Sequence, residues 1–336
     1  MKITKPFRIL SLDGGGVRGA FTATLIARLE QACPGFVDRA DLLAGTSTGS
    51  IIALMLSAGY PPDLIKKSYE EFCPEIFAPR KNAIPFAANF PFSNFTQAKY
   101  DPAPLAGFLH KFLGDQTLGQ LQKKCVVTAF RLDGEASTTH QTYMPSAPKH
   151  DNGTEDDSSR SVDPSEGPRR WRPAVFSNLP PVFGVALPDG DLRAVDAAMR
   201  SSAAPTFFPT HQGYCDGAMT ANNPSLVAIS KVLAHYQGSV FRDQIKVLSL
   251  GAGSRLNHVP GGGGDWGLWQ WAPNLLSMLM DSNQIATDLL IGLMLGNHNQ
   301  YHRLVSLDST VPVHNPPMGF NLSPRCRVSR NNSIPS

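Results

Sequence analysis

The chain has 336 residues, of which 42% are hydrophobic and 17% are charged, and its formal net charge is +3. This composition is sufficient for a buried core and argues against global disorder, and the small net charge gives no signal for a nucleic acid polymer as a partner. The five cysteines are widely spaced and form no CxxC pair, so we expect reduced thiols and neither a disulfide framework nor a bound metal.

The N-terminal part of the chain alternates strand-like and helix-like segments. Phe7–Leu12 is a short apolar run bounded by glycines, as in a buried strand. The helix expected next has large apolar residues at four-residue spacing over Phe21–Leu29, which gives it one apolar face. Leu42–Ala44 is typical of a second buried strand, and Ile51–Leu56, apolar on all sides, of a central helix. This order predicts an α/β sheet with parallel neighbouring strands.

Two later strands, Cys125–Phe130 and Ile245–Leu250, are expected on either side of a break in composition. Residues 147–172 contain few aliphatic side chains and many Pro, Gly, Ser and charged residues, so they cannot bury enough apolar area to offset the entropy of ordering. We expect them to be a flexible insertion within one domain, residues 1–310. A polar C-terminal tail follows over residues 311–336.

The first motif with chemical content is Asp13–Gly19, DGGGVRG, between the first strand and the first helix. Consecutive glycines let several backbone N–H groups point into one concavity, next to a helix N-terminus that favours negative charge. The motif contains GxGxxG, but Asp38 and Asp41, at the distance of a dinucleotide-binding acid, precede the second strand. We therefore expect no cofactor. A simple tight turn would account for some of the glycines, but not for three consecutive ones together with Arg18.

The second motif is Gly45–Gly49, GTSTG, which lies between a strand and a helix. This is the context of a nucleophile elbow, in which Ser47 projects from the end of a strand at a helix N-terminus. A nucleophilic serine needs a base, and His298 and His302 are histidines that could complete a triad. Ser47 follows only the second strand, however, which is too early for the α/β-hydrolase fold.

The third motif is Tyr214–Ala218, YCDGA, in which Asp216 stands at the end of an expected strand. An isolated Asp-Gly pair is usually a simple turn, so the motif alone does not mark a site. Asn223-Pro224, which follows, is typical of a helix N-cap with proline at the first helical position.

Taken in order, DGGGVRG, GTSTG and DGA resemble the signature of the patatin-like phospholipase family. Three further segments, Ala194–Pro209, Ser249–Gly253 and Tyr301–Arg303, are also similar to that family, so the resemblance covers about residues 7–306. Residues 147–172 depart from it. The resemblance implies a three-layer α/β/α patatin-like fold with a mostly parallel central sheet.

The resemblance also implies a serine acyl hydrolase with a Ser–Asp dyad in place of a triad. Ser47 would be the nucleophile and Asp216 the base, and a phospholipid or another acyl lipid would be cleaved through an acyl-enzyme, as by a phospholipase A-type esterase. A buried carboxylate has a raised pKa, which suits this role. The implied oxyanion-hole residues are Gly14, Gly15, Gly16 and Arg18, the last of which would support the loop or meet a phosphate.

Three alternatives remain open on the sequence alone. Some bacterial relatives are phospholipase effectors of antiviral signalling that cyclic nucleotides activate, so the resemblance allows a cyclic dinucleotide as an activator. The same dyad would serve an acyltransferase if a carrier alcohol or thiol replaced water. A non-enzymatic lipid-binding module would require an unreactive Ser47.

The relation of the chain to membranes follows from its apolar segments. Residues 1–10 lack the apolar core of a signal peptide, and the apolar stretch Leu275–Leu295 is too often interrupted to be a membrane span, so we expect a cytoplasmic protein. Trp266, Trp269 and Trp271 could belong to the core, or could form a rim that gives peripheral contact with a membrane. The interrupting residues are Asp281, Asn283, Gln284 and Asp288.

Overall fold

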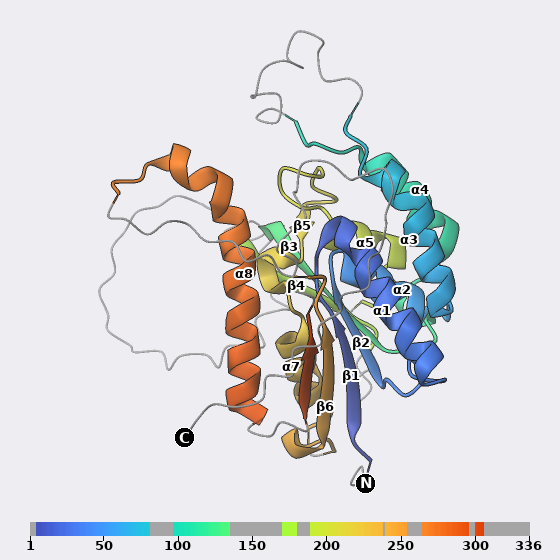
Figure 1. Ribbon diagram of the computed structural model, residues 1–336. Coiled ribbons are helices and arrows are strands. Elements are labelled where there is room, and N and C mark those ends of the chain that lie inside the picture. Colours follow the sequence, from blue (N-terminus) through green and yellow to red (C-terminus); the bar gives the residue numbers. More distant parts are fainter. Residues whose placement is uncertain are drawn as a thin grey trace, which may run out of the picture.

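The computed structural model describes residues 5–80, 97–134, 170–179, 189–237, 239–253, 264–295 and 300–305. A seven-stranded sheet lies between two layers of helices (Figure 1). The strands are β1 (Phe7–Leu12), β2 (Leu42–Thr46), β3 (Cys125–Gly134), β4 (Arg170–Ser177), β5 (Tyr214–Asp216), β6 (Ile245–Leu250) and β7 (Tyr301–Leu304). The helices are α1 (Gly19–Ala32), α2 (Thr48–Ser57), α3 (Pro62–Ile76), α4 (Pro102–Leu113), α5 (Ala194–Ser201), α6 (Ala218–Ala221), α7 (Ser225–His235) and α8 (Leu268–Leu295).

The sheet has the strand order β4-β3-β2-β1-β6-β7, and β5 also pairs with β3. The strands from β3 to β7 along this order are parallel to one another, whereas β4 and β5 are antiparallel to β3. The mostly parallel sheet and the three-layer arrangement predicted from the sequence are therefore confirmed, and so is the strand–helix order of the N-terminal part.

Both faces of the sheet are covered, and neighbouring residues of one strand enter different cores. Leu10 packs into the core formed with α1 to α5, while Ile9 packs into the core formed with α7 and α8. Figure 1 shows these two groups of helices on opposite sides of the sheet. Helix α2 is buried at every position because it lies between the sheet and its neighbouring helices, as its uniformly apolar sequence predicted.

Helix α1 differs from the prediction in the face that it buries. The fully buried side chains include Ala23, Ile26 and Ala27, whereas Leu25 and Leu29 are only partly buried at the edge of the core. The small alanines allow α1 to lie close to its neighbours α2 and α3, and the bulkier leucines fill the space beside the contact. Periodicity predicted the helix correctly but placed its centre of burial wrongly.

The end of the predicted insertion also needs correction. Residues 147–169 lie outside the described residues, but Arg170 to Arg172 belong to β4, which pairs with β3 at the edge of the sheet. An edge strand tolerates charged residues and a proline such as Pro173, since one side of its backbone needs no partner strand. The predicted tail, residues 311–336, lies outside the described residues as well.

The described part of the chain contains no helix that combines the length and the apolar character needed to cross a bilayer.

Candidate active site

The site forms where two strands meet end to end along one edge of β3. The last residue of β2, Thr46, lies opposite Thr128, and the last residue of β5, Asp216, lies opposite the next residue of β3, Ala129. The other edge of β3 is occupied by β4 over the same residues. Because β2 and β5 run in opposite directions, their carboxyl ends face each other, which brings Asp216 beside Ser47, the residue that follows β2.

Ser47 lies in a sharp turn between β2 and α2. Its backbone has φ 53° and ψ −124°, a left-handed conformation that is strained for a residue with a side chain. The turn closes because Gly49 has no side chain, since an added Cβ there would lie 2.2 Å from the carbonyl oxygen of Leu12. The Ser47 N–H donates to Ser201 Oγ at 2.8 Å. The strained backbone of Ser47 is therefore held by the close approach of Gly49 to β1 and by the hydrogen bond to Ser201, as expected of a nucleophile elbow.

The side chains of Ser47 and Asp216 are joined by a hydrogen bond. Ser47 Oγ donates to Asp216 Oδ2 at 2.7 Å, and the other carboxylate oxygen accepts from the N–H of Ala218 at 2.8 Å. Asp216 is only 3% exposed. Burial raises the pKa of Asp216 to about 6, although the hydrogen bonds from Ala218 and Ser47 act in the opposite direction. A carboxylate with a raised pKa is a better acceptor for the serine proton.

Histidine has no part in this pair within the described residues. No histidine there forms a hydrogen bond with Ser47 or Asp216, and His302 lies exposed on β7. His298 lies outside the described residues. The described geometry thus favours a dyad over a triad.

The glycine-rich loop after β1 lies beside the serine. A Cβ added to Gly14 would lie 3.4 Å from the Cβ of Ser47, but the Gly14 N–H already donates to the carbonyl oxygen of Asn222 at 3.1 Å. Among the described residues, the N–H groups of Gly15 and Gly16 have no hydrogen-bond partner. Of the three glycine N–H groups that the resemblance implies as oxyanion donors, that of Gly14 is therefore engaged within the protein, and those of Gly15 and Gly16 stay candidates.

Arg18 forms hydrogen bonds within the glycine-rich loop and from the loop to the segment after β6. Its backbone N–H donates to the carbonyl oxygen of Gly15, and its side-chain Nη1 donates to the carbonyl oxygen of Gly253 at 2.8 Å. These contacts connect the loop to the segment after β6. Arg18 thus supports the loop, which was one of the two roles considered for it.

A buried ion pair at the base of the same loop was missed by the sequence analysis. Arg303 Nη2 lies 2.5 Å from Asp13 Oδ2, and its Nε lies 2.7 Å from Asp288 Oδ2 on α8. Asp13 is 1% exposed, and Ser249 also accepts a hydrogen bond from Arg303. Asp13 and Arg303 are 290 residues apart, so no local pattern could indicate their contact.

Metal ligation is not indicated by the described part of the chain, where no group of three His, Cys, Asp or Glu side chains is placed to hold an ion.

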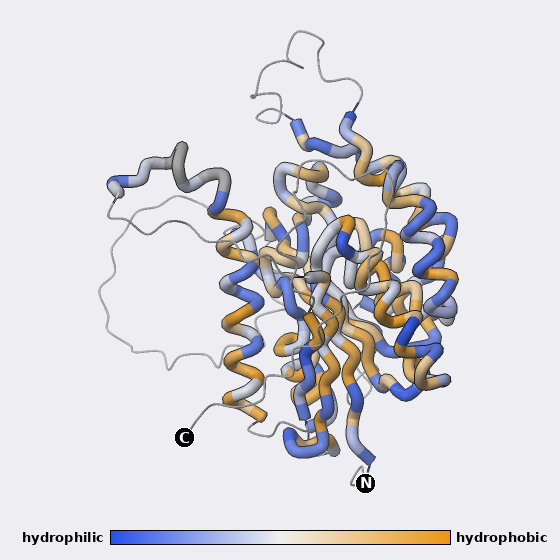
Figure 2. The backbone as a smooth tube through the Cα atoms, in the orientation of Figure 1, coloured by the Kyte–Doolittle hydropathy of each residue, from blue (hydrophilic) through white to orange (hydrophobic). Residues whose placement is uncertain are grey.

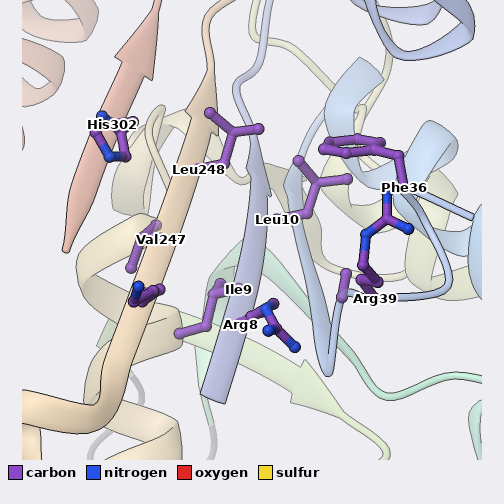
Figure 3. A pocket seen from close by; sticks show the side chains of 10 residues that line it. Arg8, Ile9, Leu10, Phe36, Arg39, Val247, Leu248 and His302 are labelled. Atoms are coloured by element: carbon purple, nitrogen blue, oxygen red, sulfur yellow. The ribbon is translucent and has the colours of Figure 1, made fainter. Parts of the chain in front are cut away.

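A shallow pocket of about 270 Å³ lies elsewhere on the sheet, over β1, β6 and β7 (Figure 3). It is lined by apolar residues such as Leu10 and Leu248, and by the side chains of Arg8, Arg39 and His302. Neither member of the serine–aspartate pair lines it. This pocket is therefore separate from the candidate active site.

Comparisons with known proteins find one matching family model and several similar proteins. A family model described as patatin-like phospholipase matches residues 10–229. A cGAMP-activated phospholipase of Vibrio cholerae is 28% identical, over 91% of this chain and 82% of the relative. A second, of Pseudomonas aeruginosa, is 26% identical over 87% of this chain and 76% of the relative. Patatin-like protein 1 of Arabidopsis thaliana is 28% identical over 82% of this chain and 68% of the relative.

Among solved structures, that of VipD from Legionella pneumophila is similar with 12% identity and a TM-score of 0.43, over 94% of this chain and 63% of VipD.

Proposed function

The chain belongs to the patatin-like phospholipase family and is a lipid acyl hydrolase, and we propose that Ser47 and Asp216 are its catalytic dyad. The observation that supports this assignment most is the 2.7 Å hydrogen bond from Ser47 Oγ to the buried carboxylate of Asp216. The left-handed backbone of Ser47 adds to it, since such strain is typical of residues that a reaction requires in one orientation.

The first half of the reaction transfers the acyl group to the enzyme. Asp216 accepts the proton of Ser47 Oγ while this oxygen attacks the carbonyl carbon of the lipid ester. The N–H groups of Gly15 and Gly16 donate to the oxyanion that forms, and one such donor is typically worth about 2.7–4 kcal/mol. The bond to the alcohol then breaks, Asp216 returns its proton to the leaving oxygen, and a lysophospholipid is released.

The second half of the reaction regenerates the serine. Asp216 takes a proton from water, the resulting hydroxide attacks the acyl-enzyme, and the same two N–H groups donate to the second oxyanion. When the bond to Ser47 Oγ breaks, Asp216 returns the proton to this oxygen and a free fatty acid leaves. One water is consumed, and the dyad ends in its starting protonation state.

The dyad predicts a pH dependence with a defined direction. Asp216 must be ionised to accept the serine proton, and its pKa is raised to about 6. We therefore expect kcat/KM to increase as the pH rises through about 6 and to level off above it. The measurement is a pH profile of kcat/KM with a soluble ester.

A second buried carboxyl provides the control for that profile. Burial also raises the pKa of Asp13 to about 6, against the opposing effect of Arg303. In the Asp13→Asn variant, kcat/KM should still increase as the pH rises through about 6, whatever the absolute value of kcat/KM. If this increase near pH 6 were lost in the Asp13→Asn variant, Asp13 and not Asp216 would be the group whose titration controls kcat/KM.

We also propose that a phospholipid is the substrate. Exposed apolar side chains stand on both segments that carry the site, Val17 on the glycine-rich loop and Met219 on α6. A longer acyl chain gains roughly 0.8 kcal/mol for each buried CH₂ group. We expect kcat/KM to increase from acetyl to medium-chain p-nitrophenyl esters, together with hydrolysis of phospholipid vesicles. An optimum at acetyl without vesicle hydrolysis would instead indicate a small-ester esterase.

A cyclic dinucleotide is a second element of the proposal, as an activator. It rests on two relatives named cGAMP-activated phospholipase, which match 91% and 87% of this chain. An activator acts by favouring the active conformation over the inactive one, so we expect cGAMP to raise the rate of vesicle hydrolysis. The control is the linear dinucleotide at the same concentration. Equal rates with and without cGAMP, in an active preparation, would exclude this activator.

A further inference from the structure

Helix α8 turns three of its polar residues, Asn283, Gln284 and Asp288, toward the rest of the protein. Asn283 accepts a hydrogen bond from the N–H of Asn222, and Gln284 accepts one from the side chain of the same residue. Further along the helix, Asp288 binds Arg303 and accepts a hydrogen bond from Asn223. The polar positions that interrupt the apolar sequence therefore form the inner face of the helix.

The outer face of α8 carries exposed apolar side chains from Trp271 to Leu293. Figure 1 shows α8 at the margin of the described fold, and Figure 2 shows hydrophobic residues recurring between hydrophilic ones along the coloured part of the helix. Eight large side chains are between 38% and 72% exposed, and at about 100° per residue they fall within an arc of about 140°. We call them the α8 stripe: Trp271, Leu275, Met278, Leu279, Ile285, Leu289, Leu290 and Leu293.

We propose that a second copy of this chain covers the α8 stripe, so that two α8 helices pair across a two-fold axis. From Trp271 to Leu289 the outward positions are alternately four and three residues apart, which is the spacing of a seam between two helices. These positions are Trp271, Leu275, Met278, Ser282, Ile285 and Leu289.

The size of the stripe agrees with a dimer interface. The exposed surface of its eight side chains amounts to roughly 800 Å², about what each partner buries in a protein–protein interface of standard size. Monomeric proteins rarely expose a contiguous apolar patch much larger than a few hundred Å². A second copy would supply an equal apolar surface, since a two-fold interface uses the same patch on both subunits.

The charge of α8 favours a protein over a bilayer as the occupant. A helix that lies on a membrane surface usually carries Lys and Arg on its polar face, where they meet lipid headgroups. Helix α8 contains neither, and its two charged residues, Asp281 and Asp288, are acidic. The polar face, moreover, is bound to Asn222, Asn223 and Arg303 of its own chain.

The small residue in the middle of the seam indicates where the two helices cross. Ser282 is exposed, and the next residue on the same face, Ala286, is also small. Because neither side chain projects far from the helix, the two backbones can approach closely at this point. In an antiparallel pair with its axis at Ser282, Leu275 would lie opposite the partner's Leu289, and Leu279 opposite the partner's Ile285. Large side chains thus flank a close crossing on both sides.

The test is the mass of the full chain in solution, measured by light scattering at micromolar concentration without lipid. We expect a dimer for the wild type and a monomer for Ile285→Glu, because the dimer would bury two carboxylates without partners. Ser277→Glu is the matched control, since Ser277 is exposed on the same helix but lies off the stripe. Circular dichroism and thermal unfolding establish that both variants fold.

Cross-linking tests the position of the axis. In a chain with Cys33 and Cys326 replaced by serine, Ser282→Cys should form a disulfide-linked dimer on mild oxidation, and Ser277→Cys should not. A wild-type monomer, or a dimer that Ile285→Glu leaves intact, would overturn the proposal. A monomer that floats with phosphatidylglycerol vesicles, and loses this binding in Ile285→Glu, would identify a bilayer as the occupant instead. A chain that is monomeric at full length, and dimerises only after removal of residues 306–336, would identify that segment as the part that covers the α8 stripe.

Discussion

Replacing Ser47 with alanine is expected to lower kcat for ester hydrolysis by at least about 10⁴-fold, the scale seen when a catalytic serine is removed. Alanine lacks the attacking oxygen but keeps a Cβ, so the strained turn at φ 53° is unchanged and the protein should remain folded. Asp216→Asn should have an effect of similar size, because an amide cannot accept the serine proton. The measurement is kcat with a medium-chain p-nitrophenyl ester, alongside circular dichroism.

Two controls separate a loss of chemistry from a loss of structure. Burial penalises the charged form of Asp216 in the folded protein, so a neutral asparagine should not lower the free energy of unfolding at pH 7. His302→Ala should retain most of the activity, since His302 is exposed on β7 and lies away from the dyad. The dyad would be the wrong assignment if His302→Ala, or His298→Ala, cost as much activity as Ser47→Ala.

Replacing Arg303 with methionine is expected to lower the free energy of unfolding by about 3–5 kcal/mol, the usual effect of breaking a buried ion pair from one side. Asp13 is 1% exposed and would lose the cation that lowers its pKa, so at pH 7 folding would require burying it without a partner or protonating it, and Asp288 would lose the same partner. Urea unfolding at pH 7 measures the change. The double variant Asp13→Asn/Arg303→Met should recover part of the loss, because it removes the buried carboxyl that has lost its partner.

A surface ion pair supplies the matched control for Arg303. Lys66 lies 3.1 Å from Glu70 on α3, with both side chains substantially exposed. Such pairs contribute about 0.3–0.5 kcal/mol, so Lys66→Met should change stability little. Equal, small losses for Arg303→Met and Lys66→Met would contradict the importance given to the buried pair.

The elements that the sequence predicted well are those whose signal is local. Phe7–Leu12 was recognisable as a strand because it is a short apolar run beside glycines, and Ile51–Leu56 as a buried helix because no polar residue interrupts it. The turn at Ser47 was recognisable for the same reason, since the glycines that permit it are its immediate neighbours. Helix α1 was predicted as an element, but small residues, which carry little hydrophobic signal, form its buried face.

The contacts that complete the site depend on long-range pairing. Asp216 reaches Ser47 only because β5 continues the line of β2 along β3, and the residues alone left an Asp-Gly turn as the simpler interpretation. The resemblance to a family pointed to Ser47 and Asp216 as a pair, but the hydrogen bond between Ser47 Oγ and Asp216 Oδ2 is visible only in the structure. Asp13 and Arg303 meet across the β1–β6–β7 side of the sheet, at a separation that no motif spans.

Helix α8 illustrates a different limit. Its polar residues, Asp281, Asn283, Gln284 and Asp288, were correctly taken as evidence against a membrane span. Their periodicity indicates a two-faced helix, but it does not say which face meets the protein. The direction is determined by the polar partners that Asn222, Asn223 and Arg303 present, and these come from two parts of the chain, the segment after α6 and strand β7.

The most direct test of the dyad is covalent labelling with an alkyl fluorophosphonate, followed by mass spectrometry of the digested protein. The serine oxygen displaces fluoride from phosphorus only when a base accepts its proton, so the label reports on the nucleophile and on its activation together. The dyad predicts one phosphonate adduct, on the peptide that contains Ser47, and its loss in Asp216→Asn. An active enzyme labelled on a different serine, or one labelled equally in Asp216→Asn, would contradict the assignment.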